Sequence, residues 1–255
     1  MENDQPLEPG LYLVGTPIGN MEDITLRALR ILSRVDALAC EDTRVTRKLF
    51  SRHSLPAPKM LFVANEHTES KVSEKMILLA QSGKSVAFCS DAGMPGISDP
   101  GYRLAEAARS AGVRVEVIPG VSAVTTAAAL SGVVAGSFTF LGFPSRREGR
   151  VRLLLRSHGA LPAAMILYES PRRLGKLLAF AADELGGARQ AAVCLELTKK
   201  FERVARGGLA KLAELYAGEP PKGEATVVIS GAAGAAPADA GDADGGTDGG
   251  FGDFS

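Results

Sequence analysis

Two patterns of hydrophobic residues alternate along the first half of the chain. Short continuous apolar runs predict buried strands, and runs with an apolar residue every three or four positions predict amphipathic helices. The predicted strands are 11–15, 35–40, 59–63, 85–89 and 113–118, and the predicted helices are 25–33, 43–52, 70–82 and 100–111. This alternation is typical of an α/β fold.

The second half of the chain repeats the alternation with more strands. The pattern predicts a helix that begins at Ser122, strands near 138–141, 163–169, 190–195, 203–206 and 225–230, and helices over 171–185 and 209–216. We place a boundary near residues 119 and 120, which predicts an N-terminal α/β domain over 1–118 and a C-terminal α/β domain over 119–231. Residues 232–255 are rich in Gly, Ala and Asp, cannot bury enough apolar surface to fold, and are predicted to form a disordered acidic tail.

The segment 90–101 connects a predicted strand to a predicted helix and has an unusual composition. It holds three Gly, which permit positive φ angles, and two Pro, which restrict the backbone. Alone, the segment is equally consistent with an elaborate turn. However, Gly- or Pro-containing loops also follow or precede other predicted strands, at 15–20, 119–122, 169–171 and 221–224. Since ligands of open α/β sheets bind at the carboxyl ends of strands, these loops predict one shared crevice.

Composition excludes several classes of protein. No run of about 18 apolar residues exists, which argues against a membrane-spanning helix, and the N-terminus lacks the apolar core of a signal peptide, which predicts a cytoplasmic protein. The three Cys lie within apolar runs and are predicted to be reduced core thiols, and without CxxC or HExxH motifs no metal site is expected. The formal net charge is zero, but five Asp lie in the tail and all Lys and Arg lie before it, so the remaining body is mildly basic.

The first Gly-rich loop, 15–20, differs from a dinucleotide-binding loop. Pro17 stands where a second Gly must let a pyrophosphate approach the backbone, and the chain has no P-loop motif. The predicted crevice therefore favours a ligand without phosphates.

Basic residues gather in two places, and both sets are candidates for contacts with RNA. The planar guanidinium of Arg and the compact ammonium of Lys suit phosphate oxygens, although a solvated surface is the alternative interpretation. The candidates are Arg44, Arg47 and Lys48 on one predicted helix, and Arg146, Arg147, Arg150 and Arg172 in the second half.

Several segments, in this order, resemble the tetrapyrrole-methylase superfamily of S-adenosyl-L-methionine-dependent methyltransferases. The matching segments are 11–20, 41–44, 90–101, 119–123, 168–171, 196–199 and 223–224. The closest resemblance is to the branch that methylates the ribose 2′-oxygen of a cytidine in the decoding centre of 16S rRNA. It implies two α/β/α domains with the cofactor cleft between them, a homodimer, and 16S rRNA or the small ribosomal subunit as partner.

The resemblance also implies which residues hold the cofactor, mainly through main-chain and apolar contacts. They are Pro17, Ile18, Gly19, Asp91, Gly93, Met94, Ile97, Ser122, Ala123, Tyr168, Leu197, Gly223, Glu224 and Ala225. Four departures from the family pattern matter. Met94 stands where Thr is common, and Leu195 replaces an Arg. Asn65 and Thr68 replace a His and an Asn, and the acidic tail stands in place of a C-terminal helical segment common in relatives.

Methyl transfer from an activated donor needs alignment more than acid–base chemistry. Orientation supplies up to about 7–11 kcal/mol, whereas a general base contributes about 10²–10⁴-fold in rate. The candidate proton acceptors are Asp42, Glu169 and Asp91, and Lys199 is a candidate to stabilise the developing alkoxide. Two alternatives are a tetrapyrrole (precorrin-type) methyltransferase that uses the same cleft and a non-catalytic RNA-binding protein.

Overall fold

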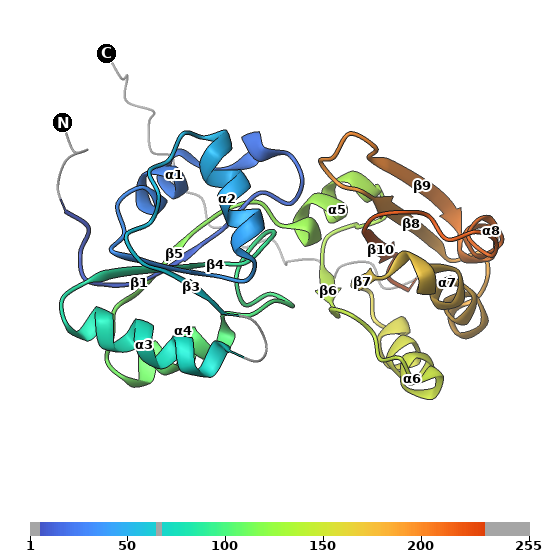
Figure 1. Cartoon of the computed structure of the whole chain (residues 1–255). Coiled ribbons are helices and arrows are strands. Elements are labelled where there is room, and N and C mark those ends of the chain that lie inside the picture. Colours follow the sequence, from blue (N-terminus) through green and yellow to red (C-terminus); the bar gives the residue numbers. More distant parts are fainter. Residues whose placement is uncertain (1–5, 65–67, 233–255) are drawn as a thin grey trace, which may run out of the picture.

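A computed structural model describes residues 6–64 and 68–232, and the predicted acidic tail beyond residue 232 lies outside the described residues. The chain forms two β-sheets that lie side by side with helices on their faces (Figure 1). The predicted α/β class with two three-layer halves is confirmed.

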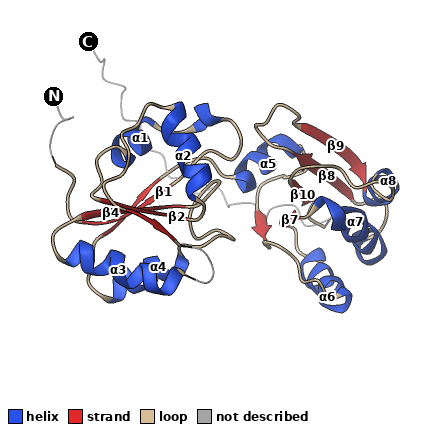
Figure 2. Cartoon of the chain, viewed as in Figure 1, coloured by secondary structure: helices blue, strands red, loops and turns tan. Residues whose placement is uncertain are grey.

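The first sheet is entirely parallel and has the strand order β3-β2-β4-β1-β5. Its strands are β1 (Gly10–Val14), β2 (Ala37–Cys40), β3 (Leu61–Val63), β4 (Ser85–Cys89) and β5 (Val115–Ile118). The 3₁₀ turn η1 (Met21–Asp23) and the helices α1 (Leu26–Leu32) and α2 (Thr43–Arg52) cover one face, and α3 (Glu69–Gln81) and α4 (Tyr102–Ser110) cover the other (Figure 2). A separate apolar cluster fills each interface, as expected for a parallel sheet that is buried on both sides.

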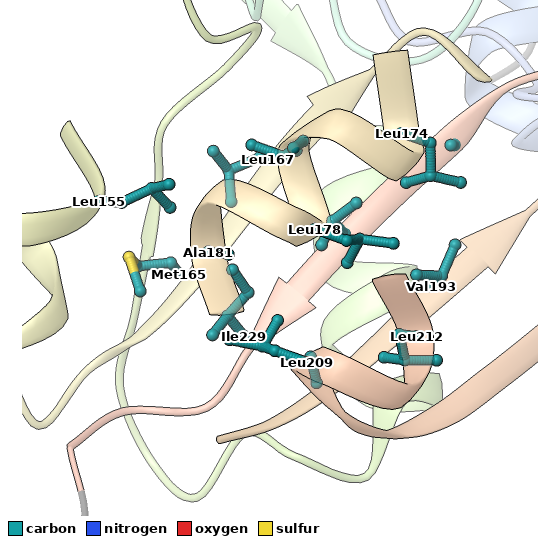
Figure 3. Close-up of a cluster of buried hydrophobic side chains, with 14 of the residues drawn as sticks. Leu155, Met165, Leu167, Leu174, Leu178, Ala181, Val193, Leu209, Leu212 and Ile229 are labelled. Carbon is teal, nitrogen blue, oxygen red and sulfur yellow. The ribbon is translucent and has the colours of Figure 1, made fainter. Parts of the chain in front are cut away.

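The second sheet is mixed and has the order β6-β7-β10-β8-β9. Its strands are β6 (Phe138–Phe140), β7 (Ala164–Glu169), β8 (Gln190–Leu195), β9 (Arg203–Gly208) and β10 (Ala225–Ile229). The helices α6 (Glu148–Gly159), α7 (Pro171–Leu185) and α8 (Leu209–Leu215) pack on one face over a Leu-rich cluster (Figure 3), and α5 (Ala123–Ser131) packs on the other.

Helix α6 is not among the helices that the sequence pattern predicts. Val151 and Leu155 are one helical turn apart and both are buried, so the segment folds against α7. Arg152 also reaches α7 and pairs with Glu148 at 2.8 Å, Glu184 at 2.9 Å and Asp183 at 3.1 Å. These three carboxylates hold the Arg152 guanidinium in place.

The topology brings the predicted loops to one place. The carboxyl ends of β1, β2, β4 and β5 share one edge of the parallel sheet. In the second sheet Ala225, at the start of β10, pairs with Glu169 on one side and with Leu195 on the other, so the ends of β7 and β8 lie beside it. The two sheets therefore present their loop-bearing edges to the same region.

Two further properties of the described residues bear on function. Within them, no helix is both long enough and apolar enough to cross a membrane. They also contain no group of three or more His, Cys, Asp or Glu side chains arranged to hold a metal ion.

Candidate active site

A cavity of about 450 Å³ lies where the two edges meet, and we call it the acidic cavity. Its walls come from both halves of the chain. The first half contributes Ile18, Glu41 and the loop after β4, and the second half contributes the start of α5, Phe143, the end of β7, Leu197 and the start of β10. Ile18 also joins Val124 of α5 and Leu197 in one apolar cluster, which ties the two halves together beneath the cavity.

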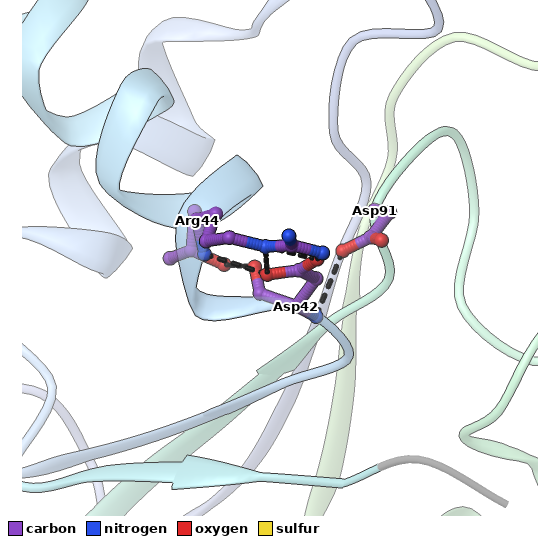
Figure 4. A network of polar contacts seen from close by, with 4 residues as sticks. Asp42, Arg44 and Asp91 are labelled. Carbon is purple, nitrogen blue, oxygen red and sulfur yellow. Dashed lines mark hydrogen bonds and ion pairs between the residues drawn. The ribbon is translucent and has the colours of Figure 1, made fainter.

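Hydrogen bonds fix the loops of the first sheet around the cavity. The N–H of Thr16 donates to the carbonyl of Gly93 at 2.9 Å, and the N–H of Gly93 donates back to Thr16 at 3.1 Å. The N–H of Asp42 donates to Oδ1 of Asp91 at 2.9 Å, which joins the loop after β2 to the loop after β4 (Figure 4). Because Gly93 adopts a φ of +82°, only Gly forms this bridge without strain.

A second set of contacts fixes the wall formed by the second sheet. Oε1 of Glu196 accepts hydrogen bonds from the N–H of Glu224 and from Nζ of Lys199, both at 2.9 Å. Nζ of Lys199 also lies 2.9 Å from Oε2 of Glu224. Gly223 leaves the space that the Glu196 carboxylate occupies, since a Cβ at residue 223 would lie 2.2 Å from Oε1 of Glu196.

The structure brings most of the predicted cofactor-binding residues into the lining of the acidic cavity. Those that line it are Ile18, Asp91, Gly93, Met94, Ile97, Ser122, Ala123, Tyr168, Leu197, Gly223, Glu224 and Ala225. Pro17 is buried outside the lining. Gly19 is also outside it and permits close approach between the halves, because a Cβ there would lie 2.5 Å from Cγ of Lys199.

The cavity is lined by five carboxyl side chains, Glu41, Asp91, Asp99, Glu169 and Glu224, and no Lys or Arg is among the described residues of its lining. Burial, together with the nearby charges of Glu41, Asp91 and Glu224, raises the pKa of Asp99 to about 6. Burial also raises the pKa of Asp91 and of Glu169. Asp99, a residue that was not among the sequence-based candidates, therefore takes up a proton near pH 6.

Glu169 is the most buried of these acids, with 2% of its surface exposed. Its Oε1 accepts a hydrogen bond from the N–H of Ser170 at 2.7 Å. Its Oε2 lies 3.2 Å from Nη2 of Arg173 but, among the described groups, receives no well-aligned hydrogen bond. That oxygen is buried, and the Arg173 guanidinium is its charged partner.

Asp42 and Lys199 lie outside the lining of the acidic cavity. The Asp42 carboxylate accepts hydrogen bonds from the N–H of Arg44 at 2.7 Å and from its Nε at 3.0 Å, and these bonds lower the pKa of Asp42 to about 2 (Figure 4). Partial burial opposes the protonated form of Lys199, but its hydrogen bonds to Glu224 and Glu196 prevail and raise its pKa. Both side chains are placed to hold loops in position.

We expect Asp42→Asn to retain methyl-transfer activity within a few-fold of the wild type. Asn caps a helix as well as Asp does, and a carboxylate with a pKa of about 2 is a weak proton acceptor at neutral pH. Single-turnover rates at saturating cofactor measure the effect. A fall of about 10²-fold or more, the size of a lost general base, would restore Asp42 as the base.

The predicted RNA-binding residues are exposed on both sides of the cavity. Arg44, Arg47 and Lys48 project from α2, whose preceding loop bonds to Asp91. Arg146 and Arg147 follow the cavity residue Phe143, Arg150 lies on α6, and Arg172 follows the cavity residue Pro171. Arg173 supports this region by donating from Nη2 to the carbonyls of Pro144 and Ser145 at 3.1 and 2.8 Å.

Three similarities to known proteins bear on this site. The sequence profile of the family described as Tetrapyrrole (Corrin/Porphyrin) Methylases matches residues 10–213. The chain is 46% identical over 226 residues to Ribosomal RNA small subunit methyltransferase I of Mesorhizobium japonicum, with 88% of this chain and 76% of that protein covered. It is 41% identical over 221 residues to the protein of the same name from Thermotoga maritima, with 87% and 98% covered.

The fold is also similar to solved structures. One is uroporphyrin-III C-methyltransferase from Thermus thermophilus in complex with S-adenosyl homocysteine, with a TM-score of 0.59, 20% sequence identity, and 86% of this chain and 96% of that chain covered.

Proposed function

The chain belongs to the tetrapyrrole methylase family and is a methyltransferase, and from this premise we propose that it uses S-adenosylmethionine to methylate 16S rRNA at the ribose 2′-oxygen of a cytidine in the decoding centre. The observation that carries the proposal is a carboxylate-lined cavity, without a basic side chain in its described lining, that is bordered by exposed Arg and Lys. Its relatives named as ribosomal RNA small subunit methyltransferases support the RNA substrate. A homodimer and a cytoplasmic location stay predictions.

The residues present fit this cofactor. A sulfonium and an ammonium group both favour a cavity lined by Glu41, Asp91 and Asp99. Gly93 keeps its wall flat, since a Cβ there would lie 3.3 Å from Cγ2 of Ile18. The same lining disfavours a pyrophosphate, in agreement with the absence of a phosphate-binding loop. The solved neighbour that contains S-adenosyl homocysteine supports the same assignment.

The charges of the site act differently on the phosphates and on the ribose hydroxyl of an RNA substrate. Phosphates are repelled by the carboxylates of the cavity and attracted by exposed cations such as Arg47, Arg146 and Arg147, whereas a neutral ribose hydroxyl enters the cavity without this cost. A tetrapyrrole with several carboxylate groups would meet the acidic lining directly. The electrostatics therefore favour RNA over the tetrapyrrole alternative.

We assign the chemistry as follows. When bound, S-adenosylmethionine supplies an activated methyl group. The loops fixed by Gly93 and Gly223 orient the reactants, and this orientation accounts for the largest share of the rate. Asp99, ionised above a pH of about 6, accepts the proton that the ribose hydroxyl loses. Asp91 retains the cationic ligand through charge, and Glu169, paired with Arg173, holds this wall of the cavity in position.

A transfer assay tests the substrate class. The protein is incubated with methyl-labelled S-adenosylmethionine and either small ribosomal subunits from cells that lack the modification or a precorrin-type tetrapyrrole. We expect label on the RNA of the subunits and none on the tetrapyrrole. Label on the tetrapyrrole, or none on either, contradicts the proposal, and RNA binding without label supports a non-catalytic RNA-binding protein.

Arg150→Ala is expected to raise the KM for ribosomal subunits. In a plot of the logarithm of the binding constant against the logarithm of the salt concentration, the slope should become shallower by about one unit, the value for one lost phosphate contact. Arg150 is exposed on α6 and makes no ion pair with another described residue. Arg152→Ala is the matched control on the same helix. Its guanidinium is held by Glu148, Asp183 and Glu184, so its loss should lower stability and leave the salt slope unchanged. Equal slopes for wild type and Arg150→Ala would remove Arg150 from the RNA interface.

A further inference from the structure

A second cavity of about 600 Å³ lies beside the acidic cavity and differs from it in charge. It is lined by Glu196, Lys200, Phe201, Glu202, Arg203 and Lys222. The two cavities share a wall, because Leu197 and Gly223 line the first while their chain neighbours Glu196 and Lys222 line the second. Lys199, bonded to Glu196 and Glu224, stands at this shared wall.

Phe201 is the most prominent side chain of the second cavity. It is 72% exposed, and Nζ of Lys200 lies 5.6 Å from the centre of its ring. A single exposed apolar residue is ordinary on a protein surface. An exposed aromatic ring that lies in a hollow with three cations, next to a candidate active site, is a stronger indication of a ligand-binding site.

The loop that carries Phe201 is held in a strained shape. Glu196 and Thr198 adopt positive φ angles of 53° and 63°, which cost free energy in residues other than Gly. The N–H of Thr198 donates to Oε2 of Glu202 at 2.7 Å, and Oγ1 of Thr198 accepts from the N–H of Asn20 at 3.0 Å. In Figure 1 this loop, between β8 and β9, extends from the second sheet toward the first half of the chain. These hydrogen bonds therefore fix the loop that carries the Phe201 ring.

The charges around the ring favour a polyanion. Lys200, Arg203 and Lys222 make no ion pair with another described residue. The two acids of the hollow are already engaged, Glu196 with Lys199 and Glu202 with the Thr198 N–H. Unpaired nucleobases stack on aromatic side chains while cations contact the neighbouring phosphates.

We propose that the second cavity binds an unpaired nucleotide of the RNA substrate, with its base stacked on Phe201 and its phosphate near Lys200, Arg203 or Lys222. The inference rests on the proposed function and extends it, since it assigns a subsite for a nucleotide next to the one that is methylated. A base held there keeps the strand in register while the target ribose lies in the acidic cavity. A second copy of this chain is the competing occupant.

A fluorescence experiment tests base stacking without methyl transfer. The sequence contains no Trp, so Phe201→Trp introduces a single fluorophore at the site. We expect a single-stranded oligoribonucleotide with the decoding-centre sequence to quench it strongly, because a base stacks on the indole. Heparin, a polyanion without bases, should leave it nearly unchanged. The control Leu78→Trp, at an exposed position on α3, should respond to neither.

Kinetic variants complete the test. Phe201→Ala and Phe201→Leu should each raise the KM for ribosomal subunits about tenfold, within the range for one stacked base. Their kcat and their affinity for S-adenosylhomocysteine should stay unchanged, and Phe201→Trp should match the wild type. Absence of quenching by the oligoribonucleotide, or wild-type KM in Phe201→Ala, overturns the inference, as does loss of self-association in sedimentation without a change in KM. Quenching in a protein that methylates no RNA would reject the proposed function and leave the nucleotide site in place.

Discussion

Gly223→Ala is expected to weaken binding of S-adenosylhomocysteine by about a hundredfold. Gly223 has a φ of +99°, and a Cβ there would lie 2.2 Å from Oε1 of Glu196. The Glu196 carboxylate is not free to move, because it holds the Glu224 N–H and Lys199. Left-handed strain costs about 1–2 kcal/mol, and a hydrogen bond to a charged group contributes about 1.5–3 kcal/mol. In the variant, the cavity wall at residue 223 should therefore adopt another conformation. Ligand binding must restore the original conformation, and this cost weakens the affinity.

Gly83→Ala is the matched control for this variant. Gly83 has a similar φ of +87°, but nothing lies within 4 Å of its Cβ position, and it follows α3 outside the lining of the acidic cavity. It should lower the Tm through backbone strain and leave the dissociation constant unchanged. Isothermal titration calorimetry measures both variants. An unchanged dissociation constant in a folded Gly223→Ala protein would show that this wall does not contact the cofactor.

Asp99→Asn is expected to lower the single-turnover rate of methyl transfer by about 10²–10⁴-fold, the range for a general base. The wild-type rate should fall as pH drops through about 6, where Asp99 takes up a proton, and be level above it. The residual rate of the variant should lack this limb. Rates from pH 5 to 8 at saturating cofactor give the comparison.

Stability distinguishes a catalytic role for Asp99 from a structural one. Its pKa is raised above the ordinary value for Asp, so the folded state binds the proton more tightly than the unfolded state. Stability therefore falls as the pH rises from 3.8 to about 6 and stays at the lower level above that. Asp99→Asn should therefore equal or exceed the wild-type Tm at pH 8. A lower Tm with a proportionate loss of activity, or a rate within threefold of the wild type, contradicts the assignment.

Much of the fold follows from the sequence because local patterns and global packing agree. The apolar runs that became β1, β2 and β4 are buried in every residue, so a continuous hydrophobic run was a sufficient signal. Helix α6 was missed because Gly149 lies in its first turn, and Gly disfavours a helix. The spacing of Val151 and Leu155 was the available signal.

The candidate site was less accessible to sequence reasoning. Most of the cofactor-binding residues that the resemblance implies line the acidic cavity, because Gly and Pro mark where a backbone must bend. Asp99 was missed because its importance comes from burial beside Glu41, Asp91 and Glu224, which belong to three separate loops. Gly19 matched a cofactor motif, yet the structure uses its missing side chain for contact with Lys199.

The most direct test of the account is the position of the transferred methyl group on the RNA. Small ribosomal subunits that lack the modification are treated with the protein and labelled S-adenosylmethionine, and the 16S rRNA is digested and analysed by mass spectrometry. The account predicts one methyl group on the ribose of a decoding-centre cytidine, visible as a bond resistant to alkaline cleavage. A methyl group on a base, or RNA that stays unmodified while a tetrapyrrole is methylated, would contradict it.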